Sequence, residues 1–450
     1  MLLTVAVAVV LHGFLGPQIG PRNLATVLTS IHWRGLLIVG LMIAGNLFCT
    51  ACPMILVRDA GRRFVTPRFS WPRARRRKWI GLTLLVLVIF SYELFGLWER
   101  PIATASIIIG YFVVALTIDL LFKGAAFCKH VCPIGQFNFV ASTMAPTELQ
   151  IKDGGTCRAC RTSDCIKGTR TPQQPLQVVR RGCELGLFLP AKVGNLDCTL
   201  CLDCVHACPH DNIALVTRVP AMELLHEGRR SGIGRLAQRS DITALAVVFT
   251  FASLVNAFVM TSPAVRLELA LGRLLHTGSE AVLLALLFAI ALVAAPAILL
   301  IGASVLTRAL AGDAAASLPA TARRYAVALV PFGAGVWLAH YGFHLFTGAL
   351  TIIPVSQSAV IDLLGRAVLG EPAWRWAGLA PGSVYPLQLG FVLLGTFGSI
   401  GLLHGVSLRD YPHRAGIASA PWLIAIVVLA ATALWIFHQP MDMRGVTGLG

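Results

Sequence analysis

The cysteines are the residues of this chain with the clearest chemistry, because all twelve fall between Cys49 and Cys208 of its 450 residues. The run DCTLCLDCVHACPHD contains four of them, Cys198, Cys201, Cys204 and Cys208, and Pro209 follows directly. In bacterial iron–sulfur proteins this spacing lets three thiolates bind one [4Fe–4S] cluster, while the cysteine before the proline binds a neighbouring cluster. The spacing therefore predicts iron–sulfur chemistry and one-electron transfer.

A second, less regular cysteine group precedes this run. Cys157, Cys160 and Cys165 stand in TCRACRTSDCIKG, and Cys183 follows in RRGCELGLF. In a two-cluster ferredoxin, each loop gives three ligands to its own cluster and its last cysteine to the other. This rule assigns Cys157, Cys160, Cys165 and Cys208 to a first cluster, and Cys198, Cys201, Cys204 and Cys183 to a second. Zinc is the alternative at both groups, because cysteine pairs with two intervening residues also make zinc sites.

Two further cysteine pairs, each followed by proline, lie at the ends of apolar segments. Cys49 and Cys52 precede Pro53, and Cys128 and Cys132 precede Pro133. If both segment ends lie at the same membrane face, the four thiols converge there and suit a third metal centre, a copper site or a redox-active dithiol. The alternative is that each Cys-Pro pair stops its helix and leaves the thiols buried and inert. His130, within the second pair, is expected at the surface rather than as a ligand.

The elements that must position these cysteines are mostly membrane helices. The chain is 56% hydrophobic and only 13% charged, and several apolar stretches reach the roughly 18–20 residues that cross a bilayer as a helix. Hydropathy predicts about nine transmembrane helices, near residues 2–16, 32–50, 79–98, 102–122, 241–260, 281–303, 326–350, 386–406 and 419–438. The expected fold is an all-α polytopic membrane protein with an inserted small α+β dicluster ferredoxin-like domain.

Three domains follow from this pattern. Residues 1–122 hold N-terminal transmembrane helices and a basic loop, residues 123–240 hold the ferredoxin-like domain and a linker, and residues 241–450 hold C-terminal transmembrane helices. Nine of the 37 basic residues lie between Arg58 and Lys78, which is the positive-inside pattern of a cytoplasmic loop. We therefore predict a protein of the cytoplasmic (inner) membrane whose clusters face the cytoplasm. Nucleic-acid binding is not expected, because no aromatic platform or recognition helix accompanies the basic loop.

Two histidines and one carboxylate within predicted spans are further candidates. WLAHYGFHLF places His340 and His344 four residues apart, on one face of a helix. Polar groups inside a membrane point into the protein and are functional candidates. Quinone binding, haem ligation and simple interhelical hydrogen bonding all fit the two histidines, and Glu93 is a candidate proton carrier for a quinone.

These motifs resemble the membrane-bound ferredoxin-type proteins of the NosR and NapH kind, and among them the membrane-intrinsic iron–sulfur proteins called FesM. The likeness rests on the two cluster loops, on NLFCTACPM at 46–54 and on FCKHVCPIGQFNF at 127–139, and covers about half of the chain. It implies electron transfer between a quinone pool or soluble donor and another redox protein. The chain has no room for a large periplasmic flavin-binding domain before its first helices, so a flavin role like that of NosR is not expected.

The expected protein is thus an electron-transfer component with two [4Fe–4S] clusters, a third metal centre as a further candidate, and redox proteins, quinone and the lipid bilayer as partners. No nucleophile, base or oxyanion arrangement stands out, so catalysis by the chain alone is not expected. Two alternatives compete with this interpretation. One is a metal-ion (copper) reductase that uses the thiols at the membrane edge, and the other is a redox-sensing or assembly subunit.

Overall fold

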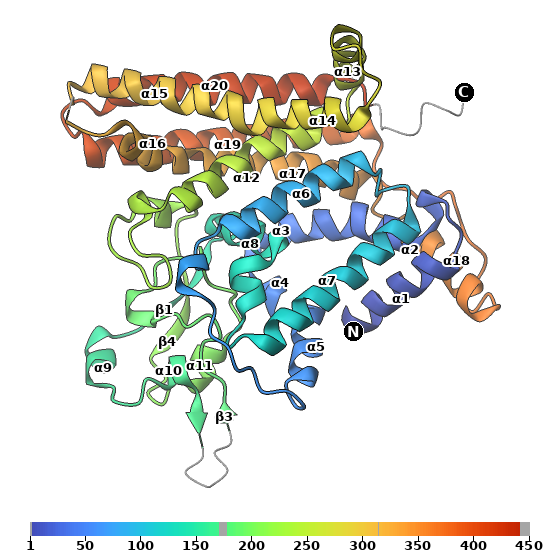
Figure 1. Ribbon diagram of the computed structural model, residues 1–450, viewed down its shortest axis with the longest axis horizontal. Helices are drawn as coiled ribbons and strands as arrows, with labels where there is room; N and C mark the ends of the chain where they lie inside the picture. The colour runs from blue at the N-terminus through green and yellow to red at the C-terminus, as the bar shows by residue number, and fades with distance from the viewer. Residues whose placement is uncertain (1, 171–177, 314, 442–450) are drawn as a thin grey trace. The chain divides into compact units, whose positions relative to one another are not determined.

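The computed structural model describes residues 2–170, 178–313 and 315–441, which are mainly helical and include two small antiparallel sheets (Figure 1). The chain forms two compact units. The helical unit comprises Met1–Val39, Leu85–Val113 and Ala246–Gly450, and the cysteine unit comprises Gly40–Leu84 and Val114–Leu245. Four helices continue from one unit into the other: α3 (Arg34–Ala44), α6 (Trp79–Leu94), α7 (Pro101–Leu121) and α12 (Ser240–Phe258).

The helical unit is built around long apolar helices whose large aromatic side chains are fully buried. Trp337, Trp422 and Phe332 lie in its core, and the Trp337 indole donates to the Phe249 carbonyl oxygen at 2.8 Å, which satisfies its polar atom. Helices α15, α19 and α20 lie side by side, and α17 packs against α19 (Figure 1). The helices and turns of this unit, besides those already named, are α1 (Leu2–Leu15), η1 (Gly20–Arg22), α2 (Leu24–Val27), η2 (Leu28–Trp33), α13 (Ser262–Leu274), α14 (Glu280–Ala289), η9 (Ile290–Ala294), α15 (Ala295–Ala311), α16 (Leu318–Ala326), η10 (Val327–Leu329), α17 (Val330–Thr347), α18 (Ile352–Leu364), α19 (Pro381–Asp410) and α20 (Ala415–His438).

Seven helices among the described residues are long and apolar enough to cross a membrane. They are Leu24–Ala44, Pro101–Leu121, Ser240–Phe258, Glu280–Ala311, Leu318–Thr347, Pro381–Asp410 and Ala415–His438. Two of the nine predicted spans fold as the shorter apolar helices Leu2–Leu15 and Trp79–Leu94, and a third short apolar helix, Ile352–Leu364, was not predicted. The predicted number of nine spans is therefore not confirmed.

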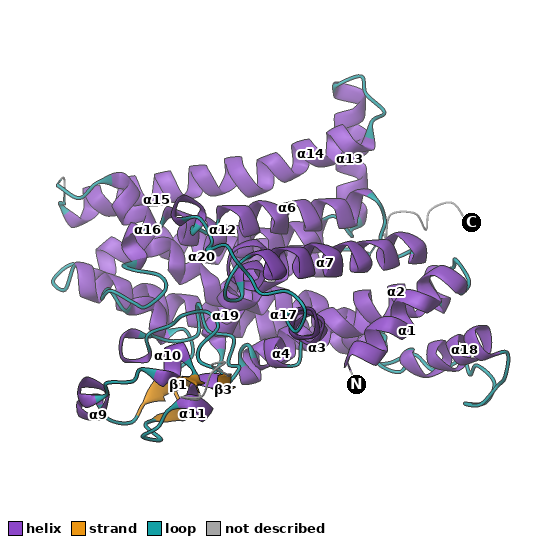
Figure 2. Ribbon diagram, turned by 60° about the horizontal axis from the view of Figure 1, so that its bottom comes forward, coloured by secondary structure: helices purple, strands orange, loops and turns teal. Residues whose placement is uncertain are grey.

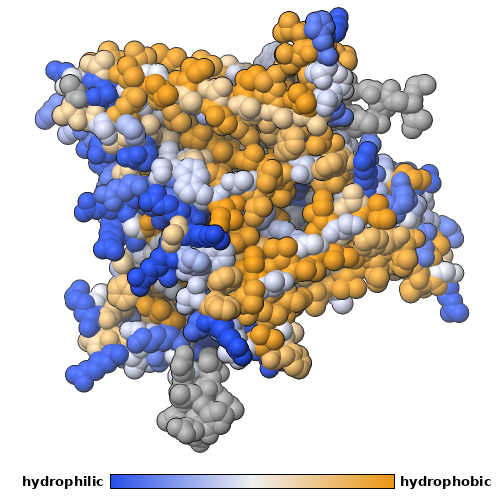
Figure 3. All heavy atoms as spheres, in the orientation of Figure 1, coloured by the Kyte–Doolittle hydropathy of each residue, from blue (hydrophilic) through white to orange (hydrophobic). Residues whose placement is uncertain are grey.

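Apolar side chains cover the outer faces of several of these helices. Figure 3 shows hydrophobic residues over α14 and α15, where Val293, Ile298 and Ile301 are each more than half exposed. A soluble protein rarely exposes a broad apolar surface of this kind, because it would be costly in water. The surface is that of a protein solvated by lipid.

The cysteine unit is a small mixed fold of short helices and strands. Strand β1 (Thr147–Ile151) pairs antiparallel with β4 (Ile213–Thr217), and β2 (Thr169–Arg170) pairs antiparallel with β3 (Val178–Arg180). Figure 2 shows these strands beside the short helices α9 to α11. The helices and turns that lie wholly in this unit are α4 (Leu47–Thr50), α5 (Pro53–Gly61), η3 (Arg73–Arg75), η4 (Phe127–Val131), α8 (Pro133–Ala141), η5 (Ser142–Met144), α9 (Gly154–Ala159), α10 (Asp164–Lys167), η6 (Leu189–Ala191), α11 (Asp203–Ala207), η7 (Met222–Leu225) and η8 (Leu236–Gln238).

Cysteines take part in the apolar core of this unit. Phe139, Leu149 and Leu200 are buried there with Cys198 and Cys204. Four more cysteines pack against this cluster, namely Cys128, Cys165, Cys183 and Cys208. Residues 40–84 belong to the same unit, so the basic loop folds with the cysteine-rich segment rather than with the first apolar helices.

Candidate metal centre

The first cysteine group lines a pocket in the cysteine unit. Cys157 lies on α9, Cys160 directly follows that helix, and Cys165 lies on α10. Cys208 comes from the end of α11, beside β4. These four thiols line one pocket with apolar side chains from β1, β4 and η6, and the pocket holds about 430 Å³ of space, counting its opening to solvent. The structure therefore brings together the four cysteines that the sequence assigned to the first cluster.

Hydrogen-bond donors surround the sulfur atoms of this pocket. Asn212 donates from Nδ2 to the Cys157 sulfur at 3.2 Å and from its backbone nitrogen to the Cys208 sulfur at 3.4 Å. Such donors stabilise a thiolate and position it for a metal. Burial, together with the neighbouring thiols of Cys208, Cys157 and Cys160, raises the pKa of the Cys165 thiol to about 11. Asn212 was missed from the sequence, since its only signal there is its position four residues after Cys208.

The second cysteine group folds through two residues in the left-handed region. Leu200 and Leu202, which separate the cysteines of the run, have φ values of 52° and 64°. Such a conformation costs a non-glycine residue about 1–3 kcal/mol and occurs often at binding sites. Leu200 is buried in the core of the unit, and burial of a leucine side chain contributes about 1.5–3 kcal/mol. Core packing thus offsets the strain of a loop that turns sharply between its cysteines.

The thiols of this second group are close enough to influence one another. Burial raises the pKa of Cys204 to about 12, with further contributions from Cys198, Cys183, Cys201 and Cys165. Backbone N–H groups of Leu200 and Leu187 donate to the sulfurs of Cys198 and Cys183, each at 3.4 Å. Because the pKa of Cys204 is raised, its thiol must release a proton when it binds a metal.

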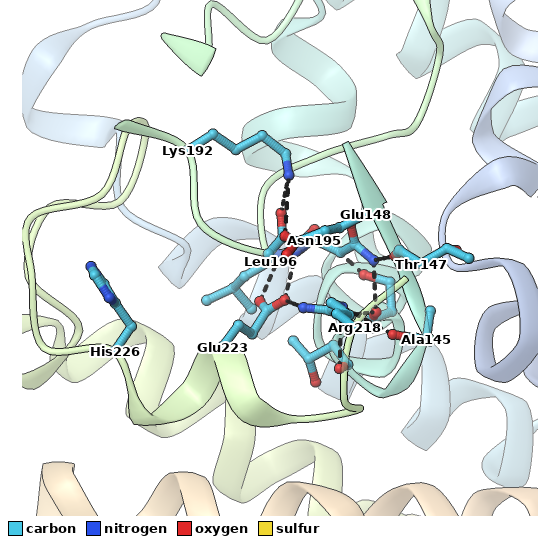
Figure 4. A network of polar contacts seen from close by, with 12 residues as sticks. Ala145, Thr147, Glu148, Lys192, Asn195, Leu196, Arg218, Glu223 and His226 are labelled. Carbon is cyan, nitrogen blue, oxygen red and sulfur yellow. Dashed lines mark hydrogen bonds and ion pairs between the residues drawn. The ribbon is translucent and has the colours of Figure 1, made fainter. Parts of the chain in front are cut away.

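A buried polar network fixes the segment before Cys198 (Figure 4). The Glu223 carboxylate accepts from the backbone nitrogens of Asn195 at 2.6 Å and Leu196 at 3.1 Å, and it pairs with Arg218. The Asn195 side chain donates to the Thr147 carbonyl oxygen on β1 at 2.8 Å. These bonds tie the start of the cysteine run to the sheet.

Residues of the N-terminal half hold the same run from the other side. Asn46 donates from Nδ2 to the Cys198 carbonyl oxygen at 2.8 Å, and Lys78 forms an ion pair of 2.6 Å with Asp197. Arg58 forms two hydrogen bonds with the Glu184 carboxylate, at 2.7 and 2.8 Å, next to Cys183. Basic residues that the sequence suggested only as topology signals therefore contact the cluster loops.

The two pairs at the helix ends share one local structure. Pro53 and Pro133 begin α5 and α8, so that Cys52 and Cys132 occupy the N-cap positions. Proline suits the first helical position, because its missing N–H would have no intrahelical partner there. The Cys132 sulfur accepts from the Gly135 nitrogen at 2.9 Å. Each Cys-Pro pair thus separates two helical segments, because α4 and η4 end just before the pairs while α5 and α8 begin at the prolines.

The four thiols of these pairs interact electrostatically. Burial raises the pKa of Cys128, and Cys132, Asp119, Cys49 and Cys52 add to this effect in that order. The third group of thiols predicted from the sequence is thus brought into electrostatic range of one another.

Interactions link the second thiol group to each of the other two. The Cys183 nitrogen donates to the Cys165 carbonyl oxygen at 2.8 Å, which joins the first and second groups. Burial raises the pKa of Cys49 to about 12, and both Cys132 and Cys198 contribute. Cys49 therefore joins the third group to the second.

His130 is not at the surface, contrary to the expectation from the sequence. Its side chain is buried and its ring stacks on Trp71, with ring centroids 5.2 Å apart and planes 6° from parallel. Burial, together with the nearby cations of Lys78 and Lys129, lowers its pKa to about 3. The local sequence did not predict this because Trp71 lies far away along the chain.

His340 and His344 lie in the helical unit, on α17, with ring centroids 5.0 Å apart. The Nε2 atoms of both rings are buried and have no hydrogen-bond partner among the described residues. They do not belong to the thiol groups, all of which lie in the cysteine unit.

The thiols of the first pocket are the donor set that an iron–sulfur cluster requires. Among the described residues, no three His, Cys, Asp or Glu side chains are placed so that they could hold a metal ion. The thiolates of a [4Fe–4S] cluster bind different iron atoms, so they need not converge on one point. Four thiols around one pocket, with N–H donors to two of the sulfurs, match this donor set.

Comparison with known proteins agrees with this chemistry. The ferredoxin-type protein NapH of Escherichia coli (strain K12) is 28% identical over 187 residues, which cover 38% of this chain and 62% of NapH. The similar proteins named NapH and MauN are ferredoxin-type proteins. The regulatory protein NosR of Pseudomonas aeruginosa is 27% identical over 33% of this chain and 21% of NosR. The methylamine utilization ferredoxin-type protein MauN of Methylobacillus flagellatus is 23% identical over 31% of this chain and 53% of MauN.

These ferredoxin-type relatives confirm the predicted likeness to the NosR and NapH kind, while the likeness to FesM stays a prediction. The chain spans about three fifths of the length of NapH and about one fifth of the length of NosR. No protein-family model matches the chain, and no solved structure matches it. With seven candidate spans, the chain is a multi-pass membrane protein.

Proposed function

We propose that the chain is a membrane-bound iron–sulfur protein that relays single electrons between a quinone pool or soluble donor and another redox protein. The observation that carries this proposal is the pocket lined by Cys157, Cys160, Cys165 and Cys208. These thiols come from two segments more than 40 residues apart in the sequence, and the pairing of β1 with β4 places the segments side by side. The ferredoxin-type relatives NapH and MauN support the same role.

Each residue group has a distinct task in this proposal. Cys157, Cys160, Cys165 and Cys208 hold the first cluster, and Cys183, Cys198, Cys201 and Cys204 hold the second. A [4Fe–4S] cluster, when bound, supplies a one-electron redox centre whose potential depends on hydrogen bonds to sulfur and on solvent exposure. Hydrogen bonds from Asn212 and from backbone N–H groups to the sulfur atoms adjust the reduction potentials. Burial of Cys198 and Cys204 limits the access of water to the second site. The cluster-bearing unit faces the cytoplasm, as the basic loop predicts.

The links between the thiol groups suggest a route for electrons through the chain. The first group opens to solvent, where a soluble redox partner has access to it. The second group contains the buried Cys198 and Cys204 and interacts electrostatically with the third through Cys49. Electrons entering at the first site would thus move toward the third thiol group, or the reverse.

Iron analysis with low-temperature EPR on purified, dithionite-reduced protein tests the proposal. We expect about eight irons per chain from two clusters. Cys157→Ser should remove the signal of the first cluster, and Cys201→Ser that of the second. Cys52→Ser serves as the matched control, because it changes a thiol outside both sets. About twelve irons would instead assign a cluster to the third group, while stoichiometric zinc without an EPR signal would overturn the relay.

The third thiol group favours one second candidate, a copper reductase. The four thiols of the third group suit Cu(I), which prefers soft thiolate ligands. In this alternative, wild-type protein retains stoichiometric Cu(I), and the variant with Cys49→Ser and Cys128→Ser loses it. Retention of iron with no copper bound by the wild type would exclude this alternative and leave the relay.

Replacing Asn212 by leucine is expected to lower the reduction potential of the first cluster. The Asn212 side chain donates to the Cys157 sulfur at 3.2 Å, and a donor to sulfur stabilises the more negative, reduced state. Redox titration followed by EPR measures the potential of each cluster. Thr162→Val is the graded comparison, since its hydroxyl lies 3.7 Å from the Cys160 sulfur and its loss should shift the potential less. An unchanged or higher potential in the leucine variant would contradict this role of Asn212.

A further inference from the structure

Four histidines of the helical unit, His12, His32, His340 and His344, fall into two classes by the hydrogen bonds of their ring nitrogens. His12 and His32 use both ring nitrogens: His12 accepts from the Leu24 nitrogen and pairs with Asp362, each at 3.0 Å, and His32 contacts the carbonyl oxygens of Val27 and Ala349 at 3.3 and 3.2 Å. His340 and His344 differ, because the buried Nε2 atom of each has no partner among the described residues. His340 is only 4% exposed. Buried polar atoms are nearly always hydrogen-bonded, so these two call for a ligand.

The Arg34 cation lies close to His340 and His344. Arg34 stands near the middle of the apolar span Leu24–Ala44, and its guanidinium lies 3.5 Å from the Tyr92 ring centroid and 5.4 Å from that of Tyr341. Charged residues within a span are rare and mark functional sites by default. The π-helical turn η2 ends directly before Arg34, and such turns often occur at functional sites.

Close helix packing brings these groups together. A Cβ atom added at Gly35 would lie 2.5 Å from Cβ of Leu345, so α3 and α17 approach closely next to Arg34 and His344. The Tyr341 ring lies 5.4 Å from the His340 ring, and Glu93 is buried, accepting from Asn256 at 2.9 Å. We name Arg34, Tyr92, Tyr341, His340 and His344 the α17 polar cluster.

The α17 polar cluster matches one class of ligand. Two imidazole nitrogens and a guanidinium can hydrogen-bond to oxygen atoms, and tyrosine rings offer flat apolar surfaces. In the apolar phase of a membrane, a quinoid ring with two carbonyl or hydroxyl oxygens has these complementary features. Haem fits less well, because the two imidazoles are on the same helix with ring planes 88° apart and cannot bind one iron from opposite sides.

We infer that the α17 polar cluster binds the head group of a lipid-soluble quinone or quinol, with His340 and His344 hydrogen-bonding to its oxygens and Arg34 placing positive charge beside them. This inference deepens the proposed function by giving the membrane carrier a site on this chain. Binding at this site does not itself require the clusters. The two ideas can therefore fail separately.

Binding of the fluorescent quinol analogue 2-heptyl-4-hydroxyquinoline N-oxide to the full chain in lipid nanodiscs tests the inference. We expect saturable quenching at one probe per chain. His340→Leu, His344→Leu and Arg34→Met should each raise the dissociation constant about ten-fold or more, as expected for loss of one hydrogen bond in a dry site. His344→Gln keeps a side-chain amide donor and should recover part of the affinity. His404→Leu is the matched control, because His404 is an exposed histidine on the membrane helix α19, and it should bind the probe as the wild type does.

Iron content of the same samples shows whether a variant chain has folded. The substituted residues lie outside the cysteine unit, so a folded variant should keep its iron. Weak probe binding with wild-type iron content supports the inference. Wild-type protein that does not bind the probe, or His340, His344 and Arg34 variants that all bind it normally, would overturn it. A haem absorbance band that His340→Leu abolishes would also overturn it in favour of haem. If iron is missing from every sample, including the wild type, while the probe binding behaves as expected, the relay fails but the quinone site stands.

Discussion

Replacing Glu223 by glutamine is expected to destabilise the cysteine unit by about 3–5 kcal/mol, the typical cost of removing one partner from a buried ion pair. Glu223 and Arg218 have side chains only 2% and 8% exposed, so the variant leaves the Arg218 cation buried without its counter-charge. The two backbone N–H groups before the cysteine run also lose a charged acceptor. Chemical denaturation of the full chain in detergent, followed by the reaction of its cysteines with a thiol reagent, measures the change, because all twelve cysteines lie in this unit.

The exposed ion pair of Lys152 with Asp211 provides the control for this prediction. These residues lie 2.9 Å apart, but their side chains are 47% and 85% exposed. Exposed pairs contribute about 0–1 kcal/mol, so Lys152→Gln should unfold nearly as the wild type does. The glutamine variant should also hold less iron at the second site, since the segment before Cys198 loses its anchor. A Glu223→Gln protein with wild-type stability and iron content would show that the network does not position the run.

Replacing Lys78 by methionine is the second change with a large expected effect, again about 3–5 kcal/mol of destabilisation. The Lys78 ammonium pairs with Asp197 at 2.6 Å, donates to the Lys129 carbonyl oxygen at 3.1 Å and lies 4.6 Å from the Phe139 ring centroid. Both charged side chains are 4% exposed, so the variant buries an unpaired carboxylate next to Cys198. The same denaturation experiment measures the loss.

Two comparison variants separate the ion pair from the charge of the basic loop. Arg77 is the adjacent basic residue and is exposed, so Arg77→Met should change stability by less than about 0.5 kcal/mol. Replacing both Lys78 by methionine and Asp197 by leucine removes the unpaired charge and should recover most of the stability, because apolar replacement of a buried pair is often nearly neutral. If Arg77→Met were as damaging as Lys78→Met, the basic loop would act through its total charge instead.

The basic loop thus has a structural use in addition to the topology that its composition suggests. Arg58 and Lys78 lie at its two ends and are 2% and 3% exposed, respectively. Both hold acidic residues next to cysteines of the second group, Glu184 and Asp197. The residues between them, including Arg73 to Arg77, are mostly exposed, and they are the ones available to the membrane surface.

The sequence by itself determined the features that depend on short-range spacing. The steps of Cys198, Cys201 and Cys204 lie within one short loop, and apolar length and composition reveal long membrane helices without knowledge of their neighbours. The ferredoxin rule also grouped Cys208 with Cys157, Cys160 and Cys165, which line one pocket. Their binding of iron stays a prediction, as does the quinone at His340 and His344.

Only the tertiary structure decided which distant residues support those motifs. Lys78 is 119 residues from Asp197, and Asn46 is 152 residues from Cys198. Neither partnership leaves a pattern in the local sequence. The burial of His130 likewise depends on side chains that folding brings close, as does the burial of the Nε2 atoms of His340 and His344, which have no partner among the described residues. The spacing of the cysteines can be read directly from the sequence. The polar groups that hold the cysteine loops in place depend on desolvation and on pairing between distant residues, and both exist only once the chain has packed.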